Sequence, residues 1–242
     1  MQQRIVIASG KGGVGKSTIS ACLAQAMAAR GKRVLLIDCD IGLRSLDMIL
    51  GVDEHVLFSW ADVVLGRCSL EQAVMAFGEI HLLCAPLSPE RALEDDMLCK
   101  LMRGCGDYDT ILIDAPAGIG FGFRAAMMAA SRCLIVSTAD PICVRSVSAA
   151  AARARRYGCN DVRLVINRFD RRLALRGELM MIDEIIDQTE ARLIGVIPQQ
   201  SRLFAHTANG APLKAALVTQ AVAQIAARLD GENVALDIPS AK

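Results

Sequence analysis

Ser9-Gly10-Lys11-Gly12-Gly13-Val14-Gly15-Lys16-Ser17-Thr18 is the stretch of this 242-residue chain that decides its fold. It fits the pattern G-x-x-x-x-G-K-[ST], in which glycines let successive backbone N–H groups converge on one phosphate chain. The helix that follows adds the positive end of its dipole. Lys16 brings a charge to the terminal phosphates of a nucleoside triphosphate, and the Ser17 hydroxyl is suited to Mg²⁺.

The same glycines also allow a different interpretation, because Gly10, Gly12 and Gly15 satisfy the dinucleotide pattern G-x-G-x-x-G, with Asp38 placed about where a ribose would be held. Lys16 decides between the two, since a pyrophosphate fingerprint does not require a lysine at the start of the helix. A chance glycine-rich turn is disfavoured by the apolar run Arg4–Ala8 before the loop and the Ala-rich stretch after it. We therefore predict an ATP/ADP site whose phosphate loop comprises Gly10, Lys11, Gly12, Gly13, Val14, Gly15, Lys16, Ser17 and Thr18.

The composition indicates a soluble α/β protein. Apolar residues make up 53% of the chain, aromatic residues only 4%, and the net charge of +1 announces no global attraction to nucleic acid or membrane. No apolar run is long enough to span a bilayer and no signal peptide is visible, so we expect a cytoplasmic protein. The nine cysteines, without any C-x-x-C, predict reduced thiols rather than a metal or iron–sulfur site.

Apolar strand-like runs alternate with helical stretches along the whole chain. The predicted strands are Arg4–Ala8, Arg33–Ile37, Ile80–Cys84, Thr110–Ile113, Cys133–Ser137, Val162–Ile166 and Leu193–Ile197. The predicted helices are Lys16–Arg30, Leu70–Phe77, Pro89–Arg103, Phe121–Ala130, Val144–Tyr157, Glu178–Thr189 and Leu213–Leu229. This alternation predicts one domain over residues 1–242, a doubly wound, mostly parallel sheet with helices on both faces, followed by an irregular tail from residue 232.

Three carboxylates follow predicted strands, where ligands bind in such sheets. Ile111–Asp114 is an apolar run that closes on one aspartate, as in a Walker B segment, so Asp114 is a candidate for holding Mg²⁺. A strand-end aspartate can equally cap the next helix, but the phosphate loop favours the metal role. Asp38 and Asp40 come two residues apart, which suits one to Mg²⁺ and the other to a water that attacks the γ-phosphate.

Lys11 is the second lysine of the loop. It cannot easily bend back to its own phosphates while Lys16 occupies that ground. We predict that Lys11 reaches a nucleotide held by a second subunit, as an arginine finger does in trans. Lys11, Lys16 and Asp40 are thus the candidate catalytic residues.

At this point the chain resembles the MinD/ParA family of deviant Walker A ATPases. The matching segments are Lys11–Ser17, Asp38–Arg44, Asp114–Gly118, Val165–Arg168 and Gly195–Pro198, with Ile37–Asp47 similar to the MinD branch. The resemblance implies an ATP-dependent homodimer that hydrolyses ATP slowly under the control of an activating or effector protein. It also implies that Asn167, with the adjoining Arg168 and Pro198, lies at the adenine, and that Ser17, Asp38 and Asp114 manage Mg²⁺.

The resemblance implies a switch in the spatial regulation of cell division, namely placement of the septum. A ParA-like DNA-segregation or cargo-positioning ATPase and a nucleotide-dependent adaptor stay open as alternatives. No basic amphipathic membrane anchor is visible, because Leu213, Leu217, Ala221, Ile225 and Leu229 form a predicted core stripe. The segment Ile142–Ala150 also lacks the acidic residues usual in the MinD branch. Nine arginines between Arg145 and Arg176 suggest a surface for non-specific DNA, or an ordinary solvated face.

Overall fold

The computed structural model describes residues 2–52, 55–77, 79–88, 96–200 and 216–236. Within these ranges eight strands form one sheet in the order β3-β4-β2-β5-β1-β6-β7-β8. Every neighbouring pair is parallel except β3 and β4, which are antiparallel. The prediction of a mostly parallel α/β sheet is confirmed.

The strands are β1 Gln3–Ala8, β2 Val34–Asp38, β3 Met75–Phe77, β4 Ile80–Leu83, β5 Thr110–Asp114, β6 Arg132–Ser137, β7 Asp161–Phe169 and β8 Arg192–Pro198. The helices are α1 Lys16–Ala28, α2 Ser45–Leu50, α3 Trp60–Val64, α4 Leu70–Ala73, α5 Met97–Arg103, α6 Phe121–Ala129, α7 Pro141–Arg156, α8 Arg171–Leu175, α9 Ile182–Thr189 and α11 Ala216–Leu229.

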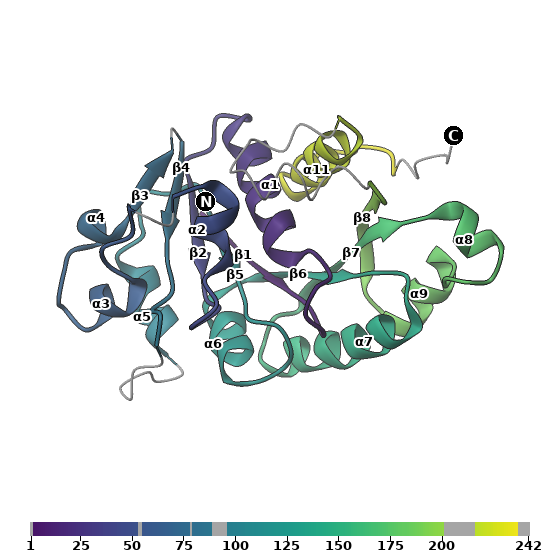
Figure 1. Cartoon of the computed structure of the whole chain (residues 1–242), viewed down its shortest axis with the longest axis horizontal. Coiled ribbons are helices and arrows are strands. Elements are labelled where there is room, and N and C mark those ends of the chain that lie inside the picture. The colour runs from purple at the N-terminus through teal and green to yellow at the C-terminus, as the bar shows by residue number, and fades with distance from the viewer. Residues whose placement is uncertain (1, 53–54, 78, 89–95, 201–215, 237–242) are drawn as a thin grey trace.

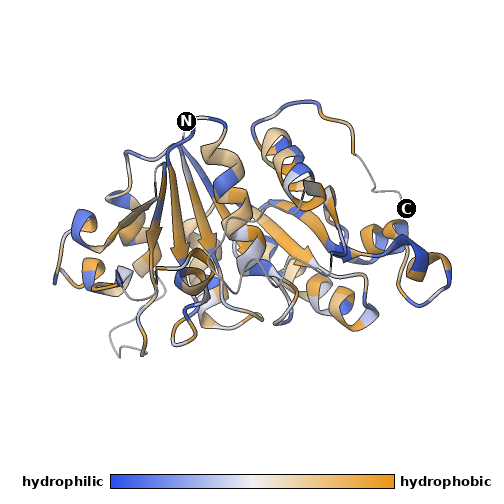
Figure 2. Ribbon diagram, turned by 45° about the horizontal axis from the view of Figure 1, so that its top comes forward, coloured by the Kyte–Doolittle hydropathy of each residue, from blue (hydrophilic) through white to orange (hydrophobic). Residues whose placement is uncertain are grey.

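Helices cover both faces of the sheet. In Figure 1, α1 and α11 lie above it and pack on each other, whereas α6 and α7 lie below it. The central strands β2 and β5 are buried along their whole length, as apolar runs in a doubly covered sheet must be. Figure 2 shows this core as a band of hydrophobic strands between the helix layers.

Several boundaries differ from the prediction. The expected helix Leu70–Phe77 ends at Ala73, because Val74 takes up an extended conformation and Met75–Phe77 pairs with β4 at the sheet edge. Met75–Phe77 thus adds an antiparallel edge strand beside β4. The expected helix over 89–103 begins at Met97, and residues 89–95 lie outside the described residues. Helix α9 begins at Ile182 rather than Glu178, where the Glu184 carboxylate accepts the backbone N–H of Met181 at 2.8 Å.

The core stripe expected for the last helix is wrong at one residue, Leu217. Leu217 is 50% exposed, while Val218, Ala221, Val222, Ile225 and Leu229 are buried. Leu213 lies outside the described residues, so its part of the prediction is untested. The short helices α2, α3 and α8 were not expected, since each is too short to carry a full helical period in sequence.

All nine cysteines are free thiols in the structure. In the part of the chain that the structure describes, no group of three or more His, Cys, Asp or Glu side chains is arranged to hold a metal ion. Among the same residues, no helix is long and apolar enough to cross a membrane.

Candidate functional site

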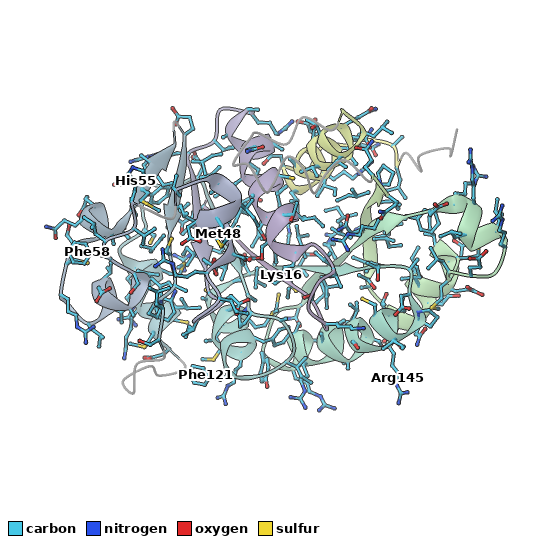
Figure 3. All side chains as sticks on the ribbon, in the orientation of Figure 1. Lys16, Met48, His55, Phe58, Phe121 and Arg145 are labelled. Carbon is cyan, nitrogen blue, oxygen red and sulfur yellow. The ribbon has the colours of Figure 1, made fainter. Side chains whose placement is uncertain are left out.

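The phosphate loop joins β1 to α1 at the carboxyl edge of the sheet, with Lys16 near the middle of the molecule (Figure 3). Gly13 and Gly15 have φ angles of 79° and 88°, in the left-handed region that favours glycine. Gly15 immediately precedes α1, so its conformation turns the chain directly into the helix. The free N–H groups of that first turn can therefore receive an anion.

Two residues of β7 hold this loop from the side. The Asn167 amide Nδ2 donates to the carbonyl of Val14 at 2.7 Å, and the Arg168 guanidinium donates to the carbonyl of Gly13 at 3.1 Å. A Cβ atom on Gly15 would come within 2.5 Å of Asn167 Nδ2. Asn167 is buried, so the bond is shielded from water. The loop shape therefore depends on a strand that lies far from it in sequence.

Gly10 fixes the loop against α7. A Cβ atom built on Gly10 would lie 2.3 Å from the backbone carbonyl carbon of Ser146. Only glycine allows so close an approach of two backbones. By contrast, a Cβ on Gly12 would find its nearest neighbour at 3.9 Å, on the side chain of Ala117.

Lys16 and Asp114 form a buried ion pair at the centre of the site. The Lys16 ammonium Nζ lies 2.9 Å from Asp114 Oδ2, and the two side chains are 7% and 0% exposed. Ser20, one turn further along α1, donates to Asp114 Oδ1 at 2.7 Å. The Lys16 ammonium also lies 3.3 Å from the Ser17 hydroxyl. The Lys16 and Asp114 side chains are thus neighbours in space.

Asp38 lies beside Asp114 in the register of β2 and β5, and it is fully buried. Its carboxylate accepts backbone N–H bonds from Asp40 at 2.8 Å and from Leu46 at 3.1 Å. Burial, reinforced by the negative charge of Asp114, raises the pKa of Asp38 to about 6. Its main-chain carbonyl accepts the indole N–H of Trp60 at 2.9 Å. Asp38 therefore organises the chain that leaves β2.

Asp40 lies on the loop after β2 and is partly exposed. Burial raises its pKa, Lys16 opposes this, and Asp114 adds to the rise. Lys11 is exposed on the phosphate loop, and its carbonyl accepts a hydrogen bond from the Ser9 hydroxyl at 3.0 Å. Lys11 is thus exposed and Asp40 partly exposed, whereas Lys16, the third candidate catalytic residue, is buried.

The structure brings most of the predicted site residues to one edge. Ser17 and Thr18 lie in the first turn of α1. Asp38 and Asp114 end the neighbouring strands β2 and β5, and Asp40 follows β2. Pro198 closes β8, in register with Phe169. Asn167 contacts the phosphate loop through its amide, so its predicted place at the adenine stays a prediction.

Sequence reasoning missed several residues that support the site. Ser20 shares the face of α1 that carries Lys16, and the helical spacing of four residues was the available signal. Arg44, at a φ of 39°, forms an ion pair of 2.5 Å with Asp47, and both side chains are nearly buried. No local sequence pattern predicts the hydrogen bond between Trp60 and Asp38, because the two residues belong to separate elements.

Comparison with known proteins gives a family. The model of the CobQ/CobB/MinD/ParA nucleotide binding domain matches residues 5–213. The chain belongs to this family. The septum site-determining protein MinD of Bacillus subtilis is 34% identical over 248 residues, covering 98% of this chain and 92% of that protein.

Solved structures of this family superpose on the whole fold. In the MinC:MinD cell division protein complex of Aquifex aeolicus, one chain is 34% identical and has a TM-score of 0.90, with 98% of both chains covered. MinD of Pyrococcus horikoshii, solved with Mg-ADP, is 27% identical with a TM-score of 0.83, over 95% of this chain and 96% of that one. The chain is thus a nucleotide-binding member of the MinD/ParA ATPases.

The arginines between residues 145 and 176 do not form one surface. Helix α7 follows β6 and returns to the opposite edge of the sheet, over roughly 24 Å for its 16 residues. Arg145 therefore lies near the carboxyl edge with the arginines of α8, while Arg153 and Arg156 lie at the other end (Figure 3 labels Arg145). The Arg155 guanidinium donates to the carbonyl of Glu190. DNA binding through Arg145–Arg176 stays a prediction.

Proposed function

We propose that this chain is an ATP-hydrolysing dimerisation switch of the MinD type that takes part in placing the division septum. The observation that carries the proposal is the buried contact of Lys16 with Asp114, set between the phosphate loop and Asp38. Near full-length similarity to septum site-determining proteins supports the biological role. The switch would be off with ADP and on as a dimer with ATP.

Binding of ATP would begin with an exchange of partners at Lys16. Its ammonium pairs with Asp114, and the β- and γ-phosphates would draw it toward the loop N–H groups. Ser20 would keep Asp114 hydrogen-bonded while Lys16 moves, so the carboxylate is not left without a partner. The loop itself would be held ready by Asn167.

The residues present fit a magnesium ion. Mg²⁺ takes oxygen ligands, keeps several waters and is bound through one or two carboxylates with substrate phosphates. Ser17 offers a hydroxyl at the loop, and Asp38 and Asp114 offer two buried carboxylates that are adjacent in the register of β2 and β5. When bound, the ion would neutralise charge that develops between the β- and γ-phosphates.

Hydrolysis would use Asp40 and Lys11. Asp40 would orient a water toward the γ-phosphorus, so that the P–O bond to ADP breaks as the new P–O bond forms and inorganic phosphate leaves. Lys11, exposed on the loop, would reach the phosphates of the second subunit and stabilise their charge. Turnover would then require the dimer, which allows an effector protein to control it. MinC, the partner of MinD in the Aquifex aeolicus complex, is a candidate for this effector.

Size-exclusion chromatography with ATP tests this division of labour. Lys11→Ala should bind one ATP for each chain but stay monomeric and fail to turn over. Wild-type protein with ADP is the control for the monomer. Normal dimerisation and turnover by Lys11→Ala would contradict the role in trans.

A further inference from the structure

A cavity of about 200 Å³ lies between the loop after β2 and helices α3, α5 and α6. Its walls are mainly apolar and include Trp60, Met97, Phe121 and Ala125. Phe121 is 51% exposed, so the cavity is bordered by a side chain that reaches the surface (Figure 3). Asp40 is the charged residue on its wall.

Residues that line the cavity contact the segments that carry the candidate nucleotide site. Trp60, on one wall, donates its indole N–H to the carbonyl of Asp38 at 2.9 Å. Pro116, on another wall, comes two residues after Asp114. Gly122 of α6 abuts that proline so closely that a Cβ atom would lie 2.5 Å from Pro116 Cγ. A ligand in the cavity would therefore contact the two segments that follow β2 and β5, the strands that end in Asp38 and Asp114.

The size and lining of the cavity define a ligand. An engineered apolar cavity of about 150 Å³ holds a benzene molecule, so this one is large enough for one ring with a short arm. Trp60 and Phe121 provide aromatic surface, which attracts rings and cations. The Asp40 carboxylate would pair with a positive charge at the end of the arm. We propose that this cavity is a binding site for a small aromatic amine.

Occupation of the cavity would slow ATP turnover, a consequence that rests on the proposed function of Asp40. An ammonium paired with Asp40 would take that carboxylate away from the attacking water. Because coupling between two sites is reciprocal, a nucleotide that engages Asp40 should in turn weaken the affinity of the cavity for the amine. The binding claim itself needs only the cavity and its charge.

Fluorescence of Trp60 tests the binding directly, because it is the single tryptophan of the chain. We would titrate the full chain, without nucleotide, with phenethylamine, 2-phenylethanol and 3-phenylpropionate, which differ mainly in charge. Phenethylamine should change the emission saturably with a dissociation constant on the order of 1 mM. It should bind roughly fivefold more tightly than the alcohol, as expected of a partly exposed ion pair, and the carboxylate should not bind.

Two variants locate the site. Ala125→Leu fills the cavity and should abolish the response to phenethylamine, whereas Ala152→Leu, at an exposed position of α7, should leave it unchanged. Asp40→Asn should keep binding but remove the preference for the amine, which preserves the test if Ala125→Leu does not fold. The absence of a saturable change with wild type, or equal binding of all three probes, would overturn the proposal.

The two proposals fail separately. If phenethylamine binds as expected but wild-type protein shows no ATP turnover, the proposed function fails and the cavity site stands. If turnover is normal and phenethylamine neither binds nor slows it, the cavity proposal fails and the switch stands.

Discussion

Lys16→Ala should destabilise the folded protein even when no nucleotide is added. Asp114 is fully buried, and the Lys16 ammonium at 2.9 Å is its opposite charge. Removing one partner of a buried ion pair leaves an uncompensated charge and costs roughly 3–5 kcal/mol. Because Ser20 still donates to Asp114, we expect the lower end, about 3 kcal/mol. Domains of ordinary stability have about 5–15 kcal/mol in total, so this loss is large.

Urea denaturation followed by the fluorescence of Trp60 would measure this loss. Lys11→Ala is the matched control, a lysine of the same loop that is exposed, and it should change the unfolding free energy by no more than about 0.5 kcal/mol. The double variant Lys16→Ala/Asp114→Asn should be more stable than Lys16→Ala alone, because no buried charge remains.

Two results would refute the reasoning about this ion pair. One is a Lys16→Ala variant that loses no more stability than Lys11→Ala. The other is a double variant whose loss equals the sum of the single losses within about 0.5 kcal/mol, since additive losses mean that the two groups do not interact. Either result would also remove the exchange of partners proposed for ATP binding.

Three further predictions concern the loop, the reaction and the pH dependence of stability. Gly10→Ala should abolish ATP binding, measured by calorimetry, because its Cβ would collide with the backbone of α7, whereas Gly12→Ala should bind with little loss; tight binding by Gly10→Ala would contradict the contact. Asp40→Ala should hold ATP in a dimer that outlasts the wild-type dimer in size-exclusion chromatography, and loss of ATP binding would instead assign Asp40 to the metal. Burial and the charge of Arg33 lower the pKa of His81 below 6.5, so its protonation favours the unfolded chain. His81 should therefore lower the stability as the pH drops through about 6.5, whereas Asp38, whose pKa is raised to about 6, acts in the opposite sense. Comparing wild type with His81→Gln in urea melts at several pH values isolates the contribution of His81; identical pH dependence in the two proteins would rule it out.

The sequence by itself determined the fold class and which residues are candidates for the site. Apolar runs that alternate with helical stretches predict a doubly covered sheet, because strands buried on both faces need continuous apolar residues. The glycine pattern around Lys16 and the aspartates that close β2 and β5 are local signals, confined to short segments. The sequence predicts that they lie together, because parallel strands have their carboxyl ends at the same edge of the sheet.

Only the tertiary structure decided what holds these groups in place. The amide of Asn167 meets the carbonyl of Val14 across 153 residues of sequence, and Ser20 meets Asp114 across 94. Met75–Phe77 joined the sheet rather than the preceding helix because β4 offered it backbone partners. The Arg168 guanidinium meets the carbonyl of Gly13 across 155 residues. Each of these outcomes depends on surfaces that exist only once distant segments have packed, and residue patterns within a short window cannot encode them.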